Sequence, residues 1–147
     1  MSPNSPTVES LEALILAQTL EAIVYADREG TIRLWNAGAE TLFGFAATEA
    51  LGASLDLIVP ERLREAHWRG FDAAIASGRT RLGGMPTRTR SLHKDGRKLY
   101  VSMSFSLVKD AQGAPIGSVA IARHAPDISA QAVGVTPGAS ASPPGTM

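Results

Sequence analysis

The sequence predicts an α+β fold in which helices cover one face of an antiparallel sheet. Two strand-like segments precede a helical region and three follow it, and this order favours a sheet with segregated helices. An Asp-Gly turn joins two of the later segments, and residues 60–77 repeat apolar side chains at helical spacing. With 147 residues, of which 44% are hydrophobic, the chain can build one domain core but not two.

The first expected element is a helix over about residues 6–19, in a flanking segment 1–19 that precedes the domain. Ser5 and Pro6 fit an N-cap and a first helical position. The apolar face of this helix carries Val8, Leu11, Leu14, Ile15 and Gln18. The pattern leaves open whether this face packs on the domain or on a second copy of the chain, and the second arrangement would make a homodimer.

A β-hairpin and two short helices are expected next. Residues 21–27 and 31–35 have the β-branched and aromatic content of strands, and Gly30 ends the turn between them. Each short helix has a polar N-cap and a closing glycine: Asn36 with residues 37–43 and Gly44, and Thr48 with residues 49–51 and Gly52.

A longer helix and three strands complete the domain. Pro60 opens the helix, which runs to about Ser77, and Gly78 follows it. His67 lies on the apolar face of this helix beside small residues, which leave room for a flat ligand. The strands are expected at residues 87–92, 98–108 and 116–123.

The composition excludes several classes of function. Fourteen basic and fourteen acidic residues cancel, so no overall positive field attracts nucleic acid, and we expect no nucleic-acid partner. The absence of cysteine excludes disulfides, thiolate metal sites and cofactors attached through sulfur. A non-covalent flavin is disfavoured because few Asn and Gln side chains are present to bind a flavin ring edge.

The N-terminus and the apolar runs of the sequence indicate where in the cell the protein is expected. No run approaches the roughly 18 apolar residues of a membrane span, and the first ten residues do not resemble a signal peptide. We therefore expect a cytoplasmic protein without a membrane partner. Residues 128–147 contain no charged residue, and 15 of these 20 residues are Ala, Gly, Ser, Pro or Thr. Such a composition is typical of a disordered tail.

Three segments resemble the PAS family. They are AIVYADREGTIRLWNAGAETLFGF (22–45), GASLDLIVPE (52–61) and HKDGRKLYVSMSFSLVKDAQGAPIGSVAIAR (93–123). The resemblance implies a PAS domain over residues 20–127, with a five-stranded antiparallel sheet, short helices, one long connector helix and a pocket between sheet and helices. The family commonly closes with Arg-Asp-Ile/Val-Thr, whereas this chain has Arg-His-Ala-Pro-Asp at residues 123–127.

The segment RLREAHWRGFDAAIASG (62–78) resembles the haem-bearing helix of oxygen-sensing PAS domains of the rhizobial sensor-kinase type. His67 precedes Asp95 of the Lys-Asp-Gly turn by 28 residues, which is also the spacing in that subgroup. The resemblance implies that His67 binds the iron of haem b. The structural alternative is a core histidine that hydrogen-bonds to the backbone.

The same resemblance implies roles for further residues around the cofactor. Arg81 would lie near its carboxylates, and Leu82, Met103 and Phe105 would cover its other side. On the helix itself, Phe71 shares the apolar face of His67, and Trp68 lies off that face, where it would flank either the cofactor edge or an interface. Thr87 falls where the oxygen sensors hold a distal arginine, and Arg88 would point away from the pocket. A distal site without a strong donor stabilises bound O₂ poorly relative to CO, so this departure leaves open which diatomic gas is bound: O₂, CO or NO. For Met103, core packing is the alternative to binding iron.

We therefore predict a sensory domain that binds haem through His67 and detects a diatomic gas or a redox state. The alternative is a PAS module for dimerisation and signalling that holds a metabolite or no cofactor. No catalytic triad, phosphate-binding glycine loop or pair of carboxylates is evident, so we expect no enzyme.

Overall fold

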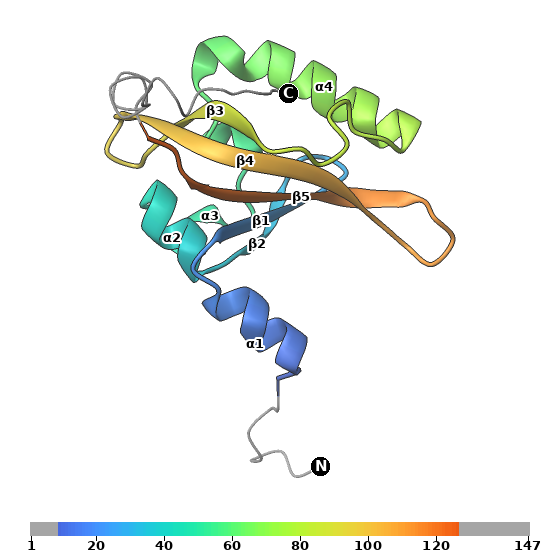
Figure 1. Ribbon diagram of the computed structural model, residues 1–147, viewed down its shortest axis with the longest axis horizontal. Coiled ribbons are helices and arrows are strands. Elements are labelled where there is room, and N and C mark those ends of the chain that lie inside the picture. Colours follow the sequence, from blue (N-terminus) through green and yellow to red (C-terminus); the bar gives the residue numbers. More distant parts are fainter. Residues whose placement is uncertain (1–8, 127–147) are drawn as a thin grey trace, which may run out of the picture.

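The computed structural model describes residues 9–126 and contains one five-stranded antiparallel sheet in the order β2-β1-β5-β4-β3 (Figure 1). The strands are β1 (Ala22–Asp27), β2 (Ile32–Trp35), β3 (Thr87–Leu92), β4 (Lys98–Lys109) and β5 (Pro115–His124). All five lie within two residues of their expected positions, so the predicted fold class is confirmed. The predicted tail over residues 128–147 lies outside the described residues.

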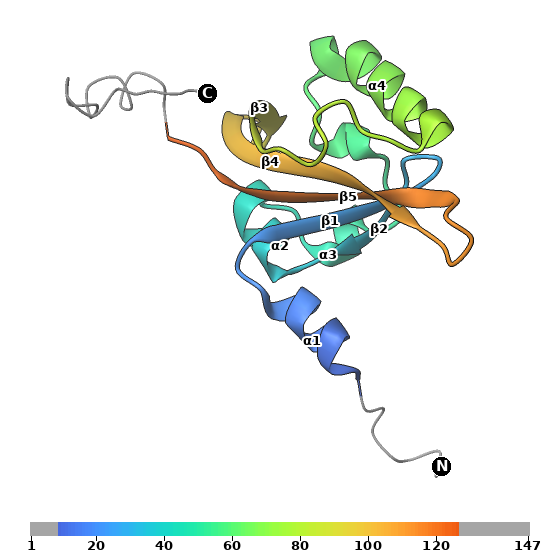
Figure 2. The ribbon, with the colours of Figure 1, turned by 45° about the vertical axis from the view of Figure 1, so that its right-hand side comes forward.

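The helical segments pack on the sheet or project from it. They are α1 (Leu11–Gln18), α2 (Ala37–Phe43), α3 (Ala47–Ala50), the short 3₁₀ turns η1 (Leu55–Leu57) and η2 (Glu61–Leu63), and α4 (Arg64–Ser77). Side chains of α2, α3 and α4 pack with the inward-facing residues of β1, β4 and β5. Helix α4 lies along one face of the sheet, while α1 projects away from it beyond the β1–β2 side (Figure 2).

Three helix starts differ from the expected ones, each for a local reason. Helix α1 begins after Ser10, whose hydroxyl accepts a hydrogen bond from the backbone N–H of Ala13, rather than after Ser5. Helix α3 begins before Thr48, because the Glu49 carboxylate accepts from the N–H of Ala46 and stabilises an earlier start. The turn that follows Pro60 is 3₁₀ before it becomes α4 at Arg64.

The side chain of Asn36 links α1, β1 and α2 through hydrogen bonds. Its side-chain oxygen accepts from the N–H groups of Ile23 and Ala39, and this confirms its predicted role as the N-cap of α2. Its amide nitrogen donates to the carbonyls of Leu16, Thr19 and Glu21, so one buried side chain fixes the end of α1 against β1 and α2.

Within residues 9–126, none of the helices has both the length and the apolar content that crossing a bilayer requires.

Candidate cofactor-binding cavity

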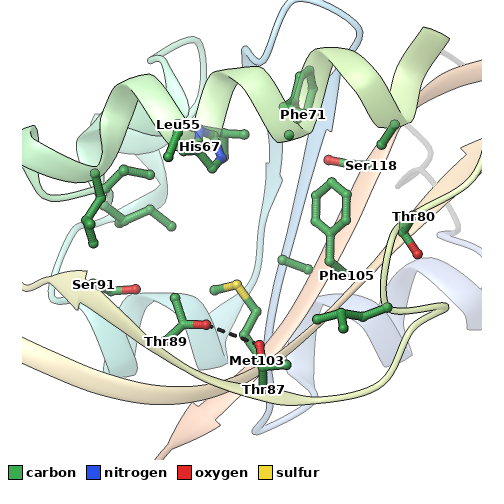
Figure 3. A pocket seen from close by; sticks show the side chains of 18 of the residues that line it. Leu55, His67, Phe71, Thr80, Thr87, Thr89, Ser91, Met103, Phe105 and Ser118 are labelled. Atoms are coloured by element: carbon green, nitrogen blue, oxygen red, sulfur yellow. Dashed lines mark hydrogen bonds between the residues drawn. The ribbon is translucent and has the colours of Figure 1, made fainter. Parts of the chain in front are cut away.

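A cavity of about 440 Å³ lies between α4, η1 and the sheet (Figure 3). This volume falls within the roughly 300–1,000 Å³ of typical small-molecule sites. Most of its lining is apolar, and the lining residues come from η1, from α4, from the segment between α4 and β3, and from the sheet. The lining includes His67, Phe71, Arg81, Leu82, Met85, Thr87, Thr89, Arg90, Ser91, Met103, Phe105 and Ser118. The sequence therefore predicted correctly that a pocket separates the long helix from the sheet.

His67 lies in the first half of α4 and lines the cavity. Its Nδ1 atom is buried and has no hydrogen-bond partner among the described residues. Burial lowers the pKa of His67 below 6.5, although the charges of Asp56 and Asp72 oppose this shift. The imidazole is therefore neutral at pH 7, and a neutral imidazole offers a nitrogen lone pair to a metal.

An unpartnered buried nitrogen needs an explanation, since leaving one unsatisfied costs about 1–3 kcal/mol. The sequence left a core histidine bonded to the backbone as the alternative, but Nδ1 has no such bond within residues 9–126. Nδ1 is itself enclosed by the protein, so a ligand of this imidazole would bind through Nε2.

Aromatic rings line the cavity on both of its sides. Phe71 follows His67 by one helical turn, is 3% exposed, and its ring centroid lies 6.1 Å from that of His67. Phe105 of β4 approaches Phe71 from the sheet, with ring centroids 6.4 Å apart. Two small residues of α4, Gly70 and Ala74, also line the space. The helix and the sheet thus form an apolar slot suited to a flat ligand.

Strand β3 supplies the wall that faces α4. Thr87 and Thr89 both line the cavity, and their hydroxyl oxygens are 3.4 Å apart (Figure 3). Thr87 pairs with Met103 across the β3–β4 ladder, so Met103 lines the same wall. Arg88 points to the opposite face, as the alternation of the strand predicts, and stacks 4.0 Å above the Tyr100 ring.

The segment between α4 and β3 carries the more exposed lining residues. Leu82 is 45% exposed and Met85 is 64% exposed, although both line the cavity. Arg81 lies in the same segment, and Arg90 of β3 also contributes to the lining. Arg81 is suited to a carboxylate of a ligand, whereas the alternation of β3 directs the Arg90 side chain to the same face as Arg88.

Trp68 is the one predicted cofactor contact that does not line the cavity. Its indole Nε1 donates to the Asp56 carboxylate at 2.8 Å. Its ring also fills the space beside Gly30, where an added Cβ would lie 2.2 Å from Trp68 Cη2. Trp68 therefore connects α4 to η1 and to the β1–β2 turn. A place for Trp68 at the cofactor edge or at an interface stays a prediction.

Several residues that line the cavity were not predicted from the sequence. Thr89 and Ser91 follow Thr87 at intervals of two, so the strand period could have identified both. Ser118 of β5 and Met85 had no comparable signal, because one depends on the pairing of strands and the other lies in an irregular loop.

The lining residues able to bind iron are His67, Met85 and Met103. Across residues 9–126 there is no cluster of three or more His, Cys, Asp or Glu side chains that could hold a metal ion. A zinc ion needs three or four protein ligands, whereas haem iron needs only one or two because the porphyrin supplies the others. The donor set of the cavity therefore fits haem better than a bare metal ion.

Comparison with known proteins identifies the family. The family model described as the PAS fold matches residues 16–127. The chain is also 28% identical over 93 residues to the oxygen sensor protein DosP of Escherichia coli strain K12, a match that covers 63% of this chain and 12% of that protein. The chain thus spans only about an eighth of the length of this relative.

Solved structures give the same result for the fold. The PAS domain of a protein from Colwellia psychrerythraea superposes with a TM-score of 0.68 at 24% identity, covering 78% of this chain and 93% of that one. The Vibrio cholerae VqmA dimer gives a TM-score of 0.63 at 16% identity, covering 86% and 57%.

The protein is a member of the PAS family, and its sensory fold contains a ligand-sized cavity. Its similarity to an oxygen sensor agrees with the resemblance noted in the sequence.

Proposed function

We propose that this domain binds haem b through His67 and senses a diatomic gas. The observation that carries the proposal is the imidazole of His67, which lines an apolar cavity of ligand size. The similarity to the oxygen sensor DosP supports it independently. Haem, once bound, would supply an iron centre with reversible affinity for O₂, CO or NO.

Each part of the cavity has a role in this proposal. His67 remains neutral and offers a lone pair, because burial lowers its pKa. Phe71 and Phe105 would pack against a flat ligand and exclude water. Arg81 would pair with a haem carboxylate. Leu82 and Met103 would cover the cofactor from the loop and from the sheet. We assign no catalytic residue.

The test is reconstitution of the purified protein with haem. The wild type should develop a sharp Soret band at one equivalent, and His67→Ala should lose it or shift it strongly. His124→Ala is the matched control, because His124 is exposed on β5 and should change nothing. Free imidazole should restore the band in His67→Ala, which would exclude misfolding as the cause.

A wild-type protein that remains colourless after reconstitution would overturn the haem proposal. The cavity would then fit the alternative function, a PAS module that binds a metabolite or no ligand. The hydroxyls of β3 favour a partly polar metabolite in that case. Circular dichroism of the same sample would verify that the tested protein is folded.

We further propose that α1 pairs two copies of the domain. The helix contains no buried residue, and its apolar side chains are exposed by 70% at Leu11 and 55% at Ile15. Such exposure is costly unless a partner covers it. Leu11→Ser together with Ile15→Ser should lower the sedimentation coefficient from that of a dimer to that of a monomer. An unchanged coefficient in the double variant would contradict pairing through α1.

A further inference from the structure

Strand β3 presents a row of hydroxyl groups to the cavity. Thr87, Thr89 and Ser91 occupy alternate positions of the strand, and all three line the cavity. Ser118 of β5 adds a fourth hydroxyl. The wall that faces α4 is therefore partly polar, although apolar side chains dominate the cavity as a whole.

The hydroxyls of Thr87 and Thr89 are not firmly engaged by the protein. Their separation of 3.4 Å is long for an O–H···O hydrogen bond, which is usually about 2.5–3.0 Å. Neither side chain makes another hydrogen bond within residues 9–126. Even if one hydroxyl donates to the other, the hydrogen of the second has no acceptor. The pair therefore retains at least one donor for a ligand.

These hydroxyls lie across the cavity from His67. Figure 3 shows His67 on the α4 side, with Thr87, Thr89 and Met103 together on the opposite wall. A ligand that approached a group held by His67 from the sheet side would meet these threonines. Thr87 and Thr89 are half-buried, so less water competes for the donor than at the open surface of the protein.

We infer that the Thr87–Thr89 pair donates a hydrogen bond to the sensed diatomic molecule and favours O₂ over CO. This inference rests on the proposed haem site and adds the selectivity of that site. Hydrogen-bond donors beside the ligand influence how strongly haem proteins hold O₂, whereas CO is a weak hydrogen-bond acceptor. The two short hydroxyl side chains take the role that a single long donor would otherwise fill.

The experiment compares Thr87→Val, Thr89→Val and the double variant with wild-type protein. Valine keeps the shape and the strand preference of threonine but lacks the hydroxyl. Thr41→Val is the control, because Thr41 is exposed on α2 and remote from the cavity. Equilibrium binding of O₂ and CO is measured for each reconstituted protein, together with the CO stretching frequency, which reports the polarity around the ligand.

The double variant should bind O₂ about two- to tenfold more weakly, which corresponds to the loss of one hydrogen bond, while its CO affinity changes little. Its CO stretching frequency should also shift, and Thr41→Val should match wild type in every measurement. The two single variants identify which hydroxyl donates.

An unchanged ratio of O₂ to CO affinity in the double variant would overturn the inference, even with haem fully bound. This outcome is distinct from failure of the proposed function, in which no variant, including wild type, would show a Soret band. The thermal midpoint of unfolding of the haem-free double variant should equal or exceed that of wild type. Both hydroxyls are removed together, so neither is left without its partner.

Discussion

The indole Nε1 of Trp68 donates a 2.8 Å hydrogen bond to the carboxylate of Asp56, directly beside the histidine of the cavity. The Trp68 ring also meets the His67 ring edge-on, with centroids 4.7 Å apart. Asp56 belongs to η1, so this contact attaches α4 to the segment that leads from the β-hairpin into the helix. The position of His67 therefore depends on the contact that its neighbour Trp68 makes between α4 and η1.

A double-mutant cycle measures this contact. Trp68→Phe and Asp56→Ala should each lower the free energy of unfolding by about 1 kcal/mol or more, because each removes one partner of the bond. The double variant should show a coupling energy of about 0.5–1.5 kcal/mol. Asp56→Asn keeps an oxygen acceptor and should lose less than Asp56→Ala. A coupling energy of zero would show that the contact adds no stability.

Gly30→Ala tests the packing of Trp68 against the β1–β2 turn. An added Cβ would lie 2.2 Å from Trp68 Cη2, and the backbone φ of +82° is itself unfavourable for alanine. Gly52→Ala isolates the backbone effect, because its φ is +88° and no atom lies within 4 Å of the added Cβ.

Gly52→Ala should cost about 1 kcal/mol in chemical denaturation, and Gly30→Ala about 1–3 kcal/mol more, from overpacking. Equal losses in the two variants would show that Trp68 moves aside freely.

Local chemistry made much of the fold predictable from the sequence. Strand alternation correctly assigned the face of Arg88, and glycines with positive φ end α2 and α4 where expected, at Gly44 (+84°) and Gly78 (+77°). Helical period likewise put His67 and Phe71 on the face of α4 that lines the cavity.

The role of Trp68 was not predictable, because its partner Asp56 is 12 residues away and meets it only through tertiary packing. The same reason applies to Ser118, which strand pairing brings to the cavity. Leu82 and Met85 lie in a loop without a period, so no sequence pattern reports how exposed they are.

Asn36→Ala should release α1 from the domain. The substitution removes two acceptor bonds and leaves the carbonyls of Leu16, Thr19 and Glu21 without their shared donor. We expect a loss of about 2–4 kcal/mol in unfolding free energy, together with faster proteolysis near residues 19–21. Asn36→Asp keeps the acceptor oxygen but not the donor, so it should keep α2 capped while α1 is still released. Protection of residues 19–21 in both variants would show that other contacts hold α1.

His67 should make stability depend on pH between about 5 and 7. Burial lowers its pKa in the folded state below 6.5, so on acidification the unfolded chain takes up a proton first. The neutral folded form is therefore fully favoured above about pH 7 and loses stability as the pH falls below 6.5. His67→Leu lacks this titratable group. Acidification from pH 7 to 5 should therefore lower the unfolding free energy of wild type more than that of the variant.

This difference isolates His67, because His93 and His124 are present in both proteins. The lowered pKa values of Asp27, Glu49 and Asp95 affect stability only at lower pH, since the ordinary pKa values of these carboxyl groups are 3.8, 4.5 and 3.8. Their contributions to stability are present above those values and are lost only as the pH falls below them. A difference between wild type and His67→Leu that stays constant from pH 7 to 5 would mean that the imidazole takes up its proton as readily in the folded protein as in the unfolded chain. Because a proton competes with iron for the same lone pair, haem bound through this nitrogen should also persist to a lower pH than haem held by an ordinary exposed histidine.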